Sequence, residues 1–160
     1  MSQARIEIDL AGQRLRLLSA DGGPRDFAVS TSKYGAGERQ GSFRTPRGRH
    51  LVRAKIGAGQ PLGAVFVARR PTGEIYSEAL ARAHPGRDWI LTRILWLSGT
   101  EIGRNRRGDV DTMRRYIYIH GTPDTDRMGE PGSIGCIRMR NRDVVELFAL
   151  VEPGTVVDIE

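Results

Sequence analysis

The chain has 160 residues and one cysteine, so we expect a single domain over residues 1–160 and exclude an intrachain disulfide. The formal net charge is +6 at pH 7, but the arginines are scattered and only 6% of the residues are aromatic. A nucleic-acid-binding surface usually combines a basic stripe with stacking rings, so nucleic acid is not an expected partner. The charge suits an ordinary basic surface or contact with an acidic polymer.

Short β-like segments separated by turns dominate the chain. Alternating polar and apolar residues at 5–10 and 13–18 predict a hairpin, and Asp-Gly-Gly-Pro at 21–24 predicts a turn. Further strand-like segments lie at 27–30, 50–56, 63–68, 89–97, 115–119 and 155–159. Long polar loops are expected at 33–49 and 98–112, and ordered loops of this length tend to be functional.

One segment, which follows Cys136, has clear helical periodicity. Asn141 is expected to cap this helix, Asp143 lies in its first turn, and Pro153-Gly154 ends it. The apolar face consists of Val144, Val145, Leu147, Phe148 and Val151. The expected fold is therefore mainly β, with one clear α-helix after the cysteine.

Cys136 and His120 are the residues best suited to nucleophilic chemistry. His120 ends a predicted strand, and Cys136 follows sixteen residues later in a glycine-containing turn. A free thiol has a pKa of about 8.5, so it needs a neighbouring base to take its proton. That base needs a partner that fixes its orientation, for which the Gly121 carbonyl, Asp124 and Asp126 are candidates. The alternative interpretation is a cysteine packed as a small core residue.

Residues beside Cys136 offer the other parts of an acyl-transfer site. Gly135 permits a tight turn that aims backbone N–H groups at an oxyanion and leaves room for an acyl group. Ser133 is expected to hydrogen-bond within the loop or to contact substrate. Arg138 follows Cys136 by two positions, so it faces the same side of an extended segment. There it is expected to bind a substrate carboxylate or to stabilise the thiolate.

Three motifs together resemble the catalytic domain of the L,D-transpeptidases. They are His-Gly-Thr at 120–122, Ser-Ile-Gly-Cys-Ile-Arg-Met at 133–139, and the segment 41–48 that ends in Thr-Pro-Arg-Gly. The resemblance spans nearly the whole chain and implies an L,D-transpeptidase-like β-sandwich or barrel with its site in a cleft. It also implies Cys136 as nucleophile and His120 as base, with no metal and no organic cofactor.

The resemblance implies peptidoglycan stem peptides as substrate. Cys136 would attack the peptide bond between meso-diaminopimelate at position three and D-alanine at position four. Transfer of the acyl group from the resulting thioester to an amine of a second stem would form a 3→3 cross-link. Transfer to water would make the protein an L,D-carboxypeptidase. Carbapenems are the inhibitors that the resemblance implies.

One position departs from the family pattern. The usual second histidine, two residues before the cysteine, is Ile134 in this chain. Isoleucine can neither hydrogen-bond nor carry a charge. We expect Ile134 to pack at the wall of the cleft while His120 alone activates the thiol. The alternative is a catalytically weak module that binds wall peptides.

The sequence also bears on metal binding and on where the protein acts. His50 and His84 match nothing in the family pattern, and three scattered histidines with one cysteine do not make a zinc site. No apolar run is long enough for a transmembrane segment, and the first residues do not resemble a secretory signal. The family implies the periplasm or cell envelope, so the route of export is left open.

Overall fold

The computed structural model describes residues 3–19 and 22–160, which form a β-barrel with one main helix. Its strands are β1 (Arg5–Asp9), β2 (Arg14–Ser19), β3 (Gly22–Ser30), β4 (Gly48–Ile56), β5 (Ala64–Val67), β6 (Arg70–Ile75), β7 (Ile90–Gly99), β8 (Tyr118–Thr122), β9 (Ile137–Arg140) and β10 (Val156–Ile159). Its helices are α1 (Glu78–Ala83), the short 3-10 helix η1 (Gly108–Val110) and α2 (Asn141–Leu150). The predicted mainly β fold is confirmed.

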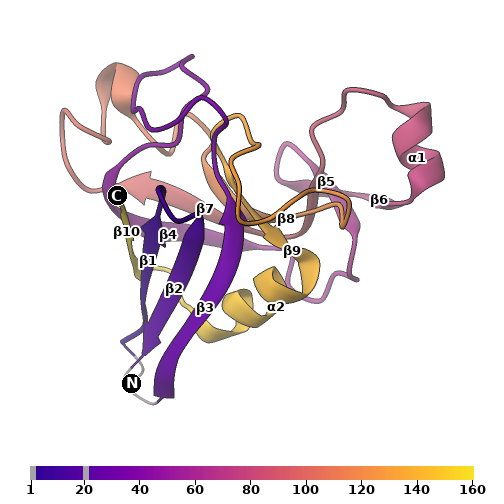
Figure 1. Ribbon diagram of the computed structural model, residues 1–160, viewed down its shortest axis with the longest axis horizontal. Coiled ribbons are helices and arrows are strands. Elements are labelled where there is room, and N and C mark those ends of the chain that lie inside the picture. Colours follow the sequence, from indigo (N-terminus) through magenta and orange to yellow (C-terminus); the bar gives the residue numbers. More distant parts are fainter. Residues whose placement is uncertain (1–2, 20–21) are drawn as a thin grey trace.

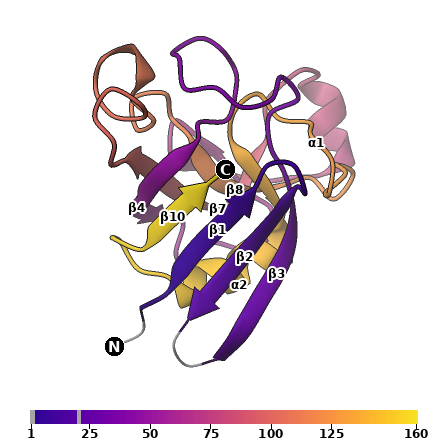
Figure 2. The same ribbon diagram turned by 60° about the vertical axis from the view of Figure 1, so that its left-hand side comes forward.

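The barrel closes because β4 pairs on both of its sides. The strand order is β4-β10-β1-β2-β3-β9-β8-β7, and β4 pairs with β10 at one edge and with β7 at the other. The hairpin of β5 and β6 extends the sheet beyond β7. Figure 1 shows this hairpin and α1 projecting to the right of the barrel, and Figure 2 shows β10, β1, β2 and β3 side by side. Closure satisfies the backbone groups that an open sheet would expose at its edges.

Most of the strand-like segments form strands, and β1 and β2 form the predicted hairpin. The strand predicted at 115–119 is wrong for 115–117, because β8 begins at Tyr118 and continues past His120 to Thr122. The turn expected at 21–24 is wrong for residues 22–24, which begin β3, and Asp21 lies outside the described residues. The sequence patterns also do not predict β6 and α1. Strand β6 contains Pro71 and Gly73, and α1 buries none of its side chains. Neither element therefore carries a strong periodic pattern.

Helix α2 packs against β7, β8 and β9, below the strands in Figure 1. Its buried residues are Val144, Leu147 and Phe148. The predicted cap is wrong, because Arg140 is the N-cap residue and Asn141 is the first residue of the helix. The Asn141 side chain instead accepts a hydrogen bond from the hydroxyl of Thr92 on β7. Asn141 therefore ties the helix to the sheet rather than capping it.

The hydrophobic core has two parts, which meet at β8 and β9. Ile119 and Ile137 belong to the main core inside the barrel. Tyr118 and Cys136 belong to a second cluster, which includes Phe66 of β5. Because side chains alternate along a strand, the thiol lies on the face of the sheet opposite the main core.

Candidate active site

The parallel pairing of β8 with β9 brings His120 and Cys136 to one face of the sheet. In this register His120 lies opposite Arg138. Two residues earlier in each segment, Tyr118 begins β8 and Cys136 directly precedes β9, and the Tyr118 N–H donates to Cys136 Sγ at 3.3 Å. Side chains two positions apart on a strand share a face. The pairing therefore brings together the two residues that the sequence singled out, although sixteen positions separate them.

The Cys136 thiol is half-buried and lies against the backbone that leads into β8. Its Sγ donates to the carbonyl oxygen of Tyr116 at 3.4 Å and accepts from the N–H of Tyr118. Tyr116 has a φ of 58°, a left-handed conformation that is uncommon for a tyrosine. Burial raises the pKa of the Cys136 thiol to about 12, and the Tyr118 N–H opposes this effect. The resting thiol is therefore neutral and needs a base.

The ring of His120 is buried and held in one tautomer. Its Nδ1 lies 2.6 Å from the carbonyl oxygen of Gly121. Because a carbonyl only accepts, Nδ1 carries the proton and Nε2 keeps the lone pair of a base. Burial lowers the pKa of His120, so the ring is neutral at neutral pH. Of the three candidate partners for this ring, the Gly121 carbonyl is the one bonded to it.

Gly121 also has a steric reason to be glycine. A Cβ at this position would collide with the side-chain oxygen of Asn141 and with the carbonyl oxygen of Leu91. The backbone that carries His120 therefore packs directly against the start of α2 and against β7. This close approach fixes the position of the carbonyl that orients the ring.

The turn before Cys136 is held by Ser133. The Ser133 hydroxyl donates to the Cys136 carbonyl at 2.6 Å and accepts from the Gly135 N–H at 3.2 Å. Gly135 has a φ of 134°, which favours glycine. Because Ser133 is buried and both bonds lie within the turn, the structure favours a role in shaping the turn. Substrate contact by Ser133 and oxyanion binding by the Gly135 N–H stay predictions.

The loop expected at 33–49 is ordered and contacts this turn directly. Thr45 is buried, and its hydroxyl donates to the Gly135 carbonyl at 2.9 Å. The same hydroxyl oxygen accepts from the Ser32 N–H at 3.0 Å. One threonine side chain thus joins the end of β3, the loop and the turn that carries the nucleophile.

Arg138 lies on the same face of the sheet as the thiol, as predicted, but carboxylates of this protein neutralise its charge. Its guanidinium lies 3.4 Å from the carboxylate of Asp88 and 3.5 Å from that of Asp126. It also donates to the Gly132 carbonyl at 3.2 Å. Binding of a substrate carboxylate by Arg138 stays a prediction, and it would require exchange of one of these partners.

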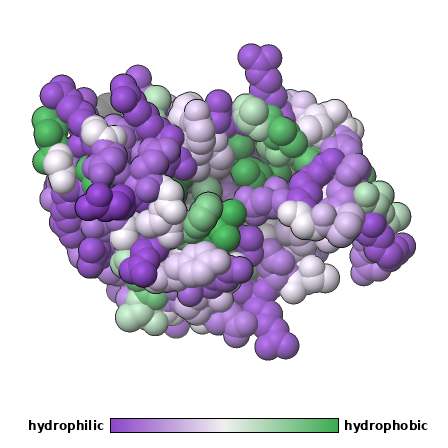
Figure 3. All heavy atoms as spheres, turned by 90° about the horizontal axis from the view of Figure 1, so that it is seen from above, coloured by the Kyte–Doolittle hydropathy of each residue, from purple (hydrophilic) through white to green (hydrophobic). Residues whose placement is uncertain are grey.

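A cavity of about 270 Å³ adjoins the turn, and Ile134 lies in its wall. Its charged lining residues are Lys33, Arg87, Arg138, Asp88 and Asp126. Ile134 is 44% exposed, so the close packing expected of it is not found. Its expected place at the wall of the active-site cleft stays a prediction, because neither Cys136 nor His120 lines this cavity. Seen from the end that carries the loops, hydrophobic side chains form small groups on a mainly hydrophilic face (Figure 3).

The arrangement is suited to general-base activation of a thiol. Among the described residues, no hydrogen bond joins His120 to the resting thiol, whose partners are Tyr116 and Tyr118. Activation would require the Cys136 side chain to rotate away from the Tyr116 carbonyl. The thiol proton would then point toward His120, which lies on the same face of the sheet. A neutral imidazole can accept that proton as the sulfur attacks an acyl carbon.

A family comparison agrees with this chemistry. A family model described as YkuD, the L,D-transpeptidase catalytic domain, matches residues 3–159. This chain belongs to the L,D-transpeptidase catalytic domain family. The candidate L,D-transpeptidase YkuD of Bacillus licheniformis is 28% identical over 156 residues, which are 97% of this chain and 64% of that protein. The corresponding YkuD protein of Bacillus subtilis is 34% identical over 94 residues, which are 59% of this chain and 47% of that protein.

Solved L,D-transpeptidase structures share the fold. L,D-transpeptidase 3 from Mycobacterium tuberculosis superposes with a TM-score of 0.60 at 14% identity, covering 99% of this chain and 61% of that chain. At this identity the likeness concerns the fold alone. The chain spans 64% and 47% of the length of the two Bacillus relatives, so the activity of a complete L,D-transpeptidase is a proposal for it.

Several residues that contact Cys136 or its neighbours were not singled out by sequence reasoning. Tyr116 and Tyr118 contact the thiol through their backbones, and Asp88 pairs with Arg138. The alternation of the two tyrosines with His120 in one predicted strand was the available signal. Thr45 lies within the family's Thr-Pro-Arg-Gly segment, but its contact with the turn depends on tertiary folding.

The described residues give two further observations on ligands and membranes. In residues 3–19 and 22–160, no group of three or more His, Cys, Asp or Glu side chains is arranged to hold a metal ion. None of the helices in these residues is both long enough and apolar enough to cross a membrane. His84 is exposed at the end of α1.

Proposed function

We propose that the chain is an L,D-transpeptidase that acts on peptidoglycan stem peptides through a thioester on Cys136 and forms 3→3 cross-links. The observation that carries the proposal is the neutral His120 ring, with Nε2 free, on the strand face that also carries the thiol. The Gly121 carbonyl holds the ring, and Ser133 holds the nucleophile's turn. Acyl transfer by a cysteine requires such an oriented base beside the thiol.

The first half of the proposed reaction forms the thioester. Cys136 Sγ attacks the carbonyl carbon of the diaminopimelate residue while the thiol proton passes to His120 Nε2. The tetrahedral oxyanion then collapses and the C–N bond to D-alanine breaks. His120 returns the proton to the departing amine, which leaves a neutral ring and an acyl group on Cys136.

The second half transfers the acyl group. An amine of another stem attacks the thioester carbonyl and gives its proton to His120. The C–S bond breaks, the new amide forms, and His120 returns the proton to the Cys136 thiolate. No external oxidant, reductant or cofactor is needed, because one proton moves between sulfur, imidazole and amine in each half.

Structures of L,D-transpeptidases with β-lactams support an acyl-accepting site on this fold. L,D-transpeptidase 3 from Mycobacterium tuberculosis has been solved with a faropenem-derived adduct, and LdtMt1 in complex with imipenem. These proteins are 14% and 15% identical to this chain. We infer that carbapenems acylate Cys136 in the same kind of site.

Two alternatives use the same site. Water as acceptor would make the protein an L,D-carboxypeptidase acting on the same stems. The second alternative is a catalytically weak module that binds wall peptides, which the absence of a histidine at Ile134 suggests. The raised pKa of the Cys136 thiol and its contact with the Tyr116 carbonyl favour this module.

Purified muropeptides incubated with the protein distinguish these functions by mass spectrometry. A dimer linked through position three of both stems supports the proposal, and a shortened stem identifies the carboxypeptidase. Unchanged muropeptides that nevertheless bind the protein indicate the binding module. Cys136→Ala is the control, and product formed by this variant at the parent rate would refute a thioester on Cys136.

The proposed substrate also sets the proposed place of action. Peptidoglycan is a polymer of the cell envelope, so we propose that the protein acts there. A formal net charge of +6 would favour contact with the acidic groups of such a polymer.

A further inference from the structure

Arg115 lies directly before the tyrosine that contacts the thiol, and its side chain reaches across to the 33–49 loop. Its guanidinium donates to the carbonyl oxygen of Arg44 at 2.6 Å, to that of Gly37 at 3.2 Å and to the hydroxyl of Ser42 at 3.4 Å. The guanidinium of Arg115 therefore binds both ends of the loop segment 37–44.

All three acceptors of Arg115 are neutral, and in the described residues Arg115 forms no ion pair. Other arginines around the site do have acidic partners. Arg138 pairs with Asp88 and Asp126, and Arg47 forms two hydrogen bonds to Glu38. Partial burial of a charge is costly unless an opposite charge is close by. Arg115 is thus a half-buried cation without an ion pair among the described residues. Burial lowers the pKa of Arg115, and the Glu38 carboxylate, which is bonded to Arg47, is a negative charge that raises it.

The reaction itself would create a further negative charge near Arg115. When His120 takes the proton, a negative charge forms on Cys136, and acyl transfer then moves the charge onto an oxyanion. The positive charge of Arg115 lowers the pKa of the thiol, against the effect of burial. Arg138 acts in the same direction, but Asp88 raises the pKa of the thiol. Arg115 is therefore the neighbouring cation whose effect no ion pair offsets.

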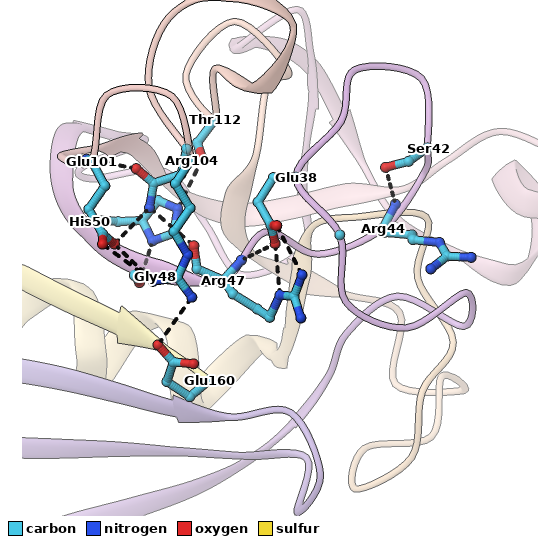
Figure 4. A network of polar contacts seen from close by, with 12 residues as sticks. Glu38, Ser42, Arg44, Arg47, Gly48, His50, Glu101, Arg104, Thr112 and Glu160 are labelled. Atoms are coloured by element: carbon cyan, nitrogen blue, oxygen red, sulfur yellow. Dashed lines mark hydrogen bonds and ion pairs between the residues drawn. The ribbon is translucent and has the colours of Figure 1, made fainter.

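The backbone that carries Arg115 is held firmly in place. The ring of His50 is buried, with Nε2 3.0 Å from the Thr112 hydroxyl and Nδ1 3.0 Å from the Gly48 carbonyl (Figure 4). The Arg115 N–H donates to the Asp111 carbonyl at 3.0 Å. The segment that leads to the thiol is thus anchored on β4, which fixes the backbone from which the Arg115 side chain extends.

Thr45 connects the loop to the nucleophile. Arg115 binds the carbonyl of Arg44, and the next residue, Thr45, donates to the carbonyl of Gly135 beside Cys136. A guanidinium that secures the loop therefore also secures the turn that presents the thiol.

From these contacts we infer that Arg115 is a positioning residue of the site, which fastens the 37–44 segment against the Cys136 turn and supplies the unpaired positive charge that favours the thiolate. The inference rests on the proposed function in that Cys136 is the nucleophile. It concerns the ionisation of the thiol and not the identity of the acyl donor or acceptor.

The test is the pH dependence of Cys136 alkylation by iodoacetamide, followed by intact mass. The chain has one cysteine, so each adduct reports this thiol. Arg115→Gln removes the charge and should shift the alkylation profile to higher pH by about one unit, which slows the reaction about tenfold at neutral pH. Arg115→Lys keeps the charge and should keep the profile near that of the parent. Arg114→Gln removes a neighbouring exposed charge and should leave the profile unchanged.

The role of Arg115 in holding the 37–44 segment is tested separately, by limited proteolysis. Lysine cannot reproduce the fork that binds two carbonyls and a hydroxyl. Limited proteolysis should therefore cut Arg115→Lys within 37–44 faster than the parent, although the two share an alkylation profile. Thermal unfolding shows whether each variant is folded.

Three results would overturn the inference: a parental profile for folded Arg115→Gln, an equal shift in Arg115→Gln and Arg115→Lys, or a shift as large in Arg114→Gln. If Arg115→Gln does not fold, Arg115→Lys decides alone, and a shifted profile in that variant overturns the role of the charge. A failure of the muropeptide assay leaves the alkylation result intact, so the two hypotheses fail separately.

Discussion

The Cys136 thiol donates its hydrogen to the carbonyl oxygen of Tyr116 across 3.4 Å. A carbonyl stabilises the neutral thiol and disfavours the thiolate, and burial acts in the same direction. The resting site therefore holds an unreactive sulfur beside a neutral base. Reactivity has to come from proton transfer to His120 at the moment of attack.

His120→Gln should lower kcat by about a hundredfold to ten-thousandfold, because glutamine can hydrogen-bond but cannot accept the thiol proton. KM for muropeptides should change much less than kcat. Steady-state kinetics on purified muropeptides provides the measurement. A variant with parental kcat and a raised KM would identify His120 as a substrate contact.

A carbapenem should add once to each chain, because its strained carbonyl is an acyl donor and Cys136 is the single thiol. Intact-mass spectrometry after incubation detects the adduct. Cys136→Ala should remain unmodified under the same conditions. An adduct of equal yield on Cys136→Ala would show that another group is acylated.

Ile134→His should change the rate of Cys136 alkylation by about threefold at most, because one oriented base suffices to accept the thiol proton. The Ile134 side chain lines a cavity and is 44% exposed, so a histidine there would be well solvated. Alkylation rates across pH and turnover of muropeptides are the two measurements. A gain of several orders of magnitude in turnover would show that the natural site is impaired, and the binding module would become the leading function.

Thr45→Val should destabilise the protein by about 1–3 kcal/mol, since it leaves the buried Gly135 carbonyl and Ser32 N–H without their partner. It should also slow acylation of Cys136, because the nucleophile's turn loses a support. Thr45→Ser keeps the hydroxyl and is the matched control. Urea unfolding measures the free energy, and equal stability of the valine and serine variants would contradict the role of the hydroxyl.

His50 should make the stability of the protein depend on pH. Burial lowers the pKa of His50 from 6.5 to about 4, so between these values the unfolded chain binds a proton that the folded chain does not. The contribution of neutral His50 is complete above pH 6.5 and declines as the pH falls to about 4. A shift of this size corresponds to about 3 kcal/mol.

His50→Gln removes the titrating group but not the buried position between Gly48 and Thr112. The difference in unfolding free energy between the parent and this variant should therefore shrink as the pH falls through that window. Urea unfolding of both proteins at several pH values measures it. A difference that is independent of pH would mean that His50 does not titrate on unfolding.

The sequence predicted much of the fold because its strands alternate clearly. Ile6, Ile8, Leu15 and Leu17 mark the two strands of the first hairpin, and all four are buried. Closure of the barrel could not be predicted in this way, since the pairing of β4 with β7 is a tertiary contact with no local pattern. The cap at Asn141 was predicted wrongly because the helix begins at Asn141 itself, whose side chain accepts a tertiary hydrogen bond from Thr92.

The candidate site was predictable where it depends on motifs. His120, Gly121, Gly135 and Cys136 carry the chemistry of their residue types and lie in motifs of the L,D-transpeptidase family. The role of Arg115 was not predictable, because it depends on three hydrogen-bond acceptors that residues 37–44 provide only in the folded protein. In a chain with many arginines, the sequence does not indicate which of them will bind a distant loop.

The parallel pairing of β8 and β9 places His120 and Cys136 on one face of the sheet. Their positions therefore do not depend on the number of residues that connect the two strands. The connection between the two strands has exposed positions such as Asp124 and Glu130, apart from the Ser133–Cys136 turn that the site requires. Insertions or deletions there would leave the imidazole and the thiol where strand pairing places them. The spacing between histidine and cysteine can therefore vary through the exposed part of the connection, and a search for distant relatives that assumes sixteen residues would miss proteins with the same chemistry.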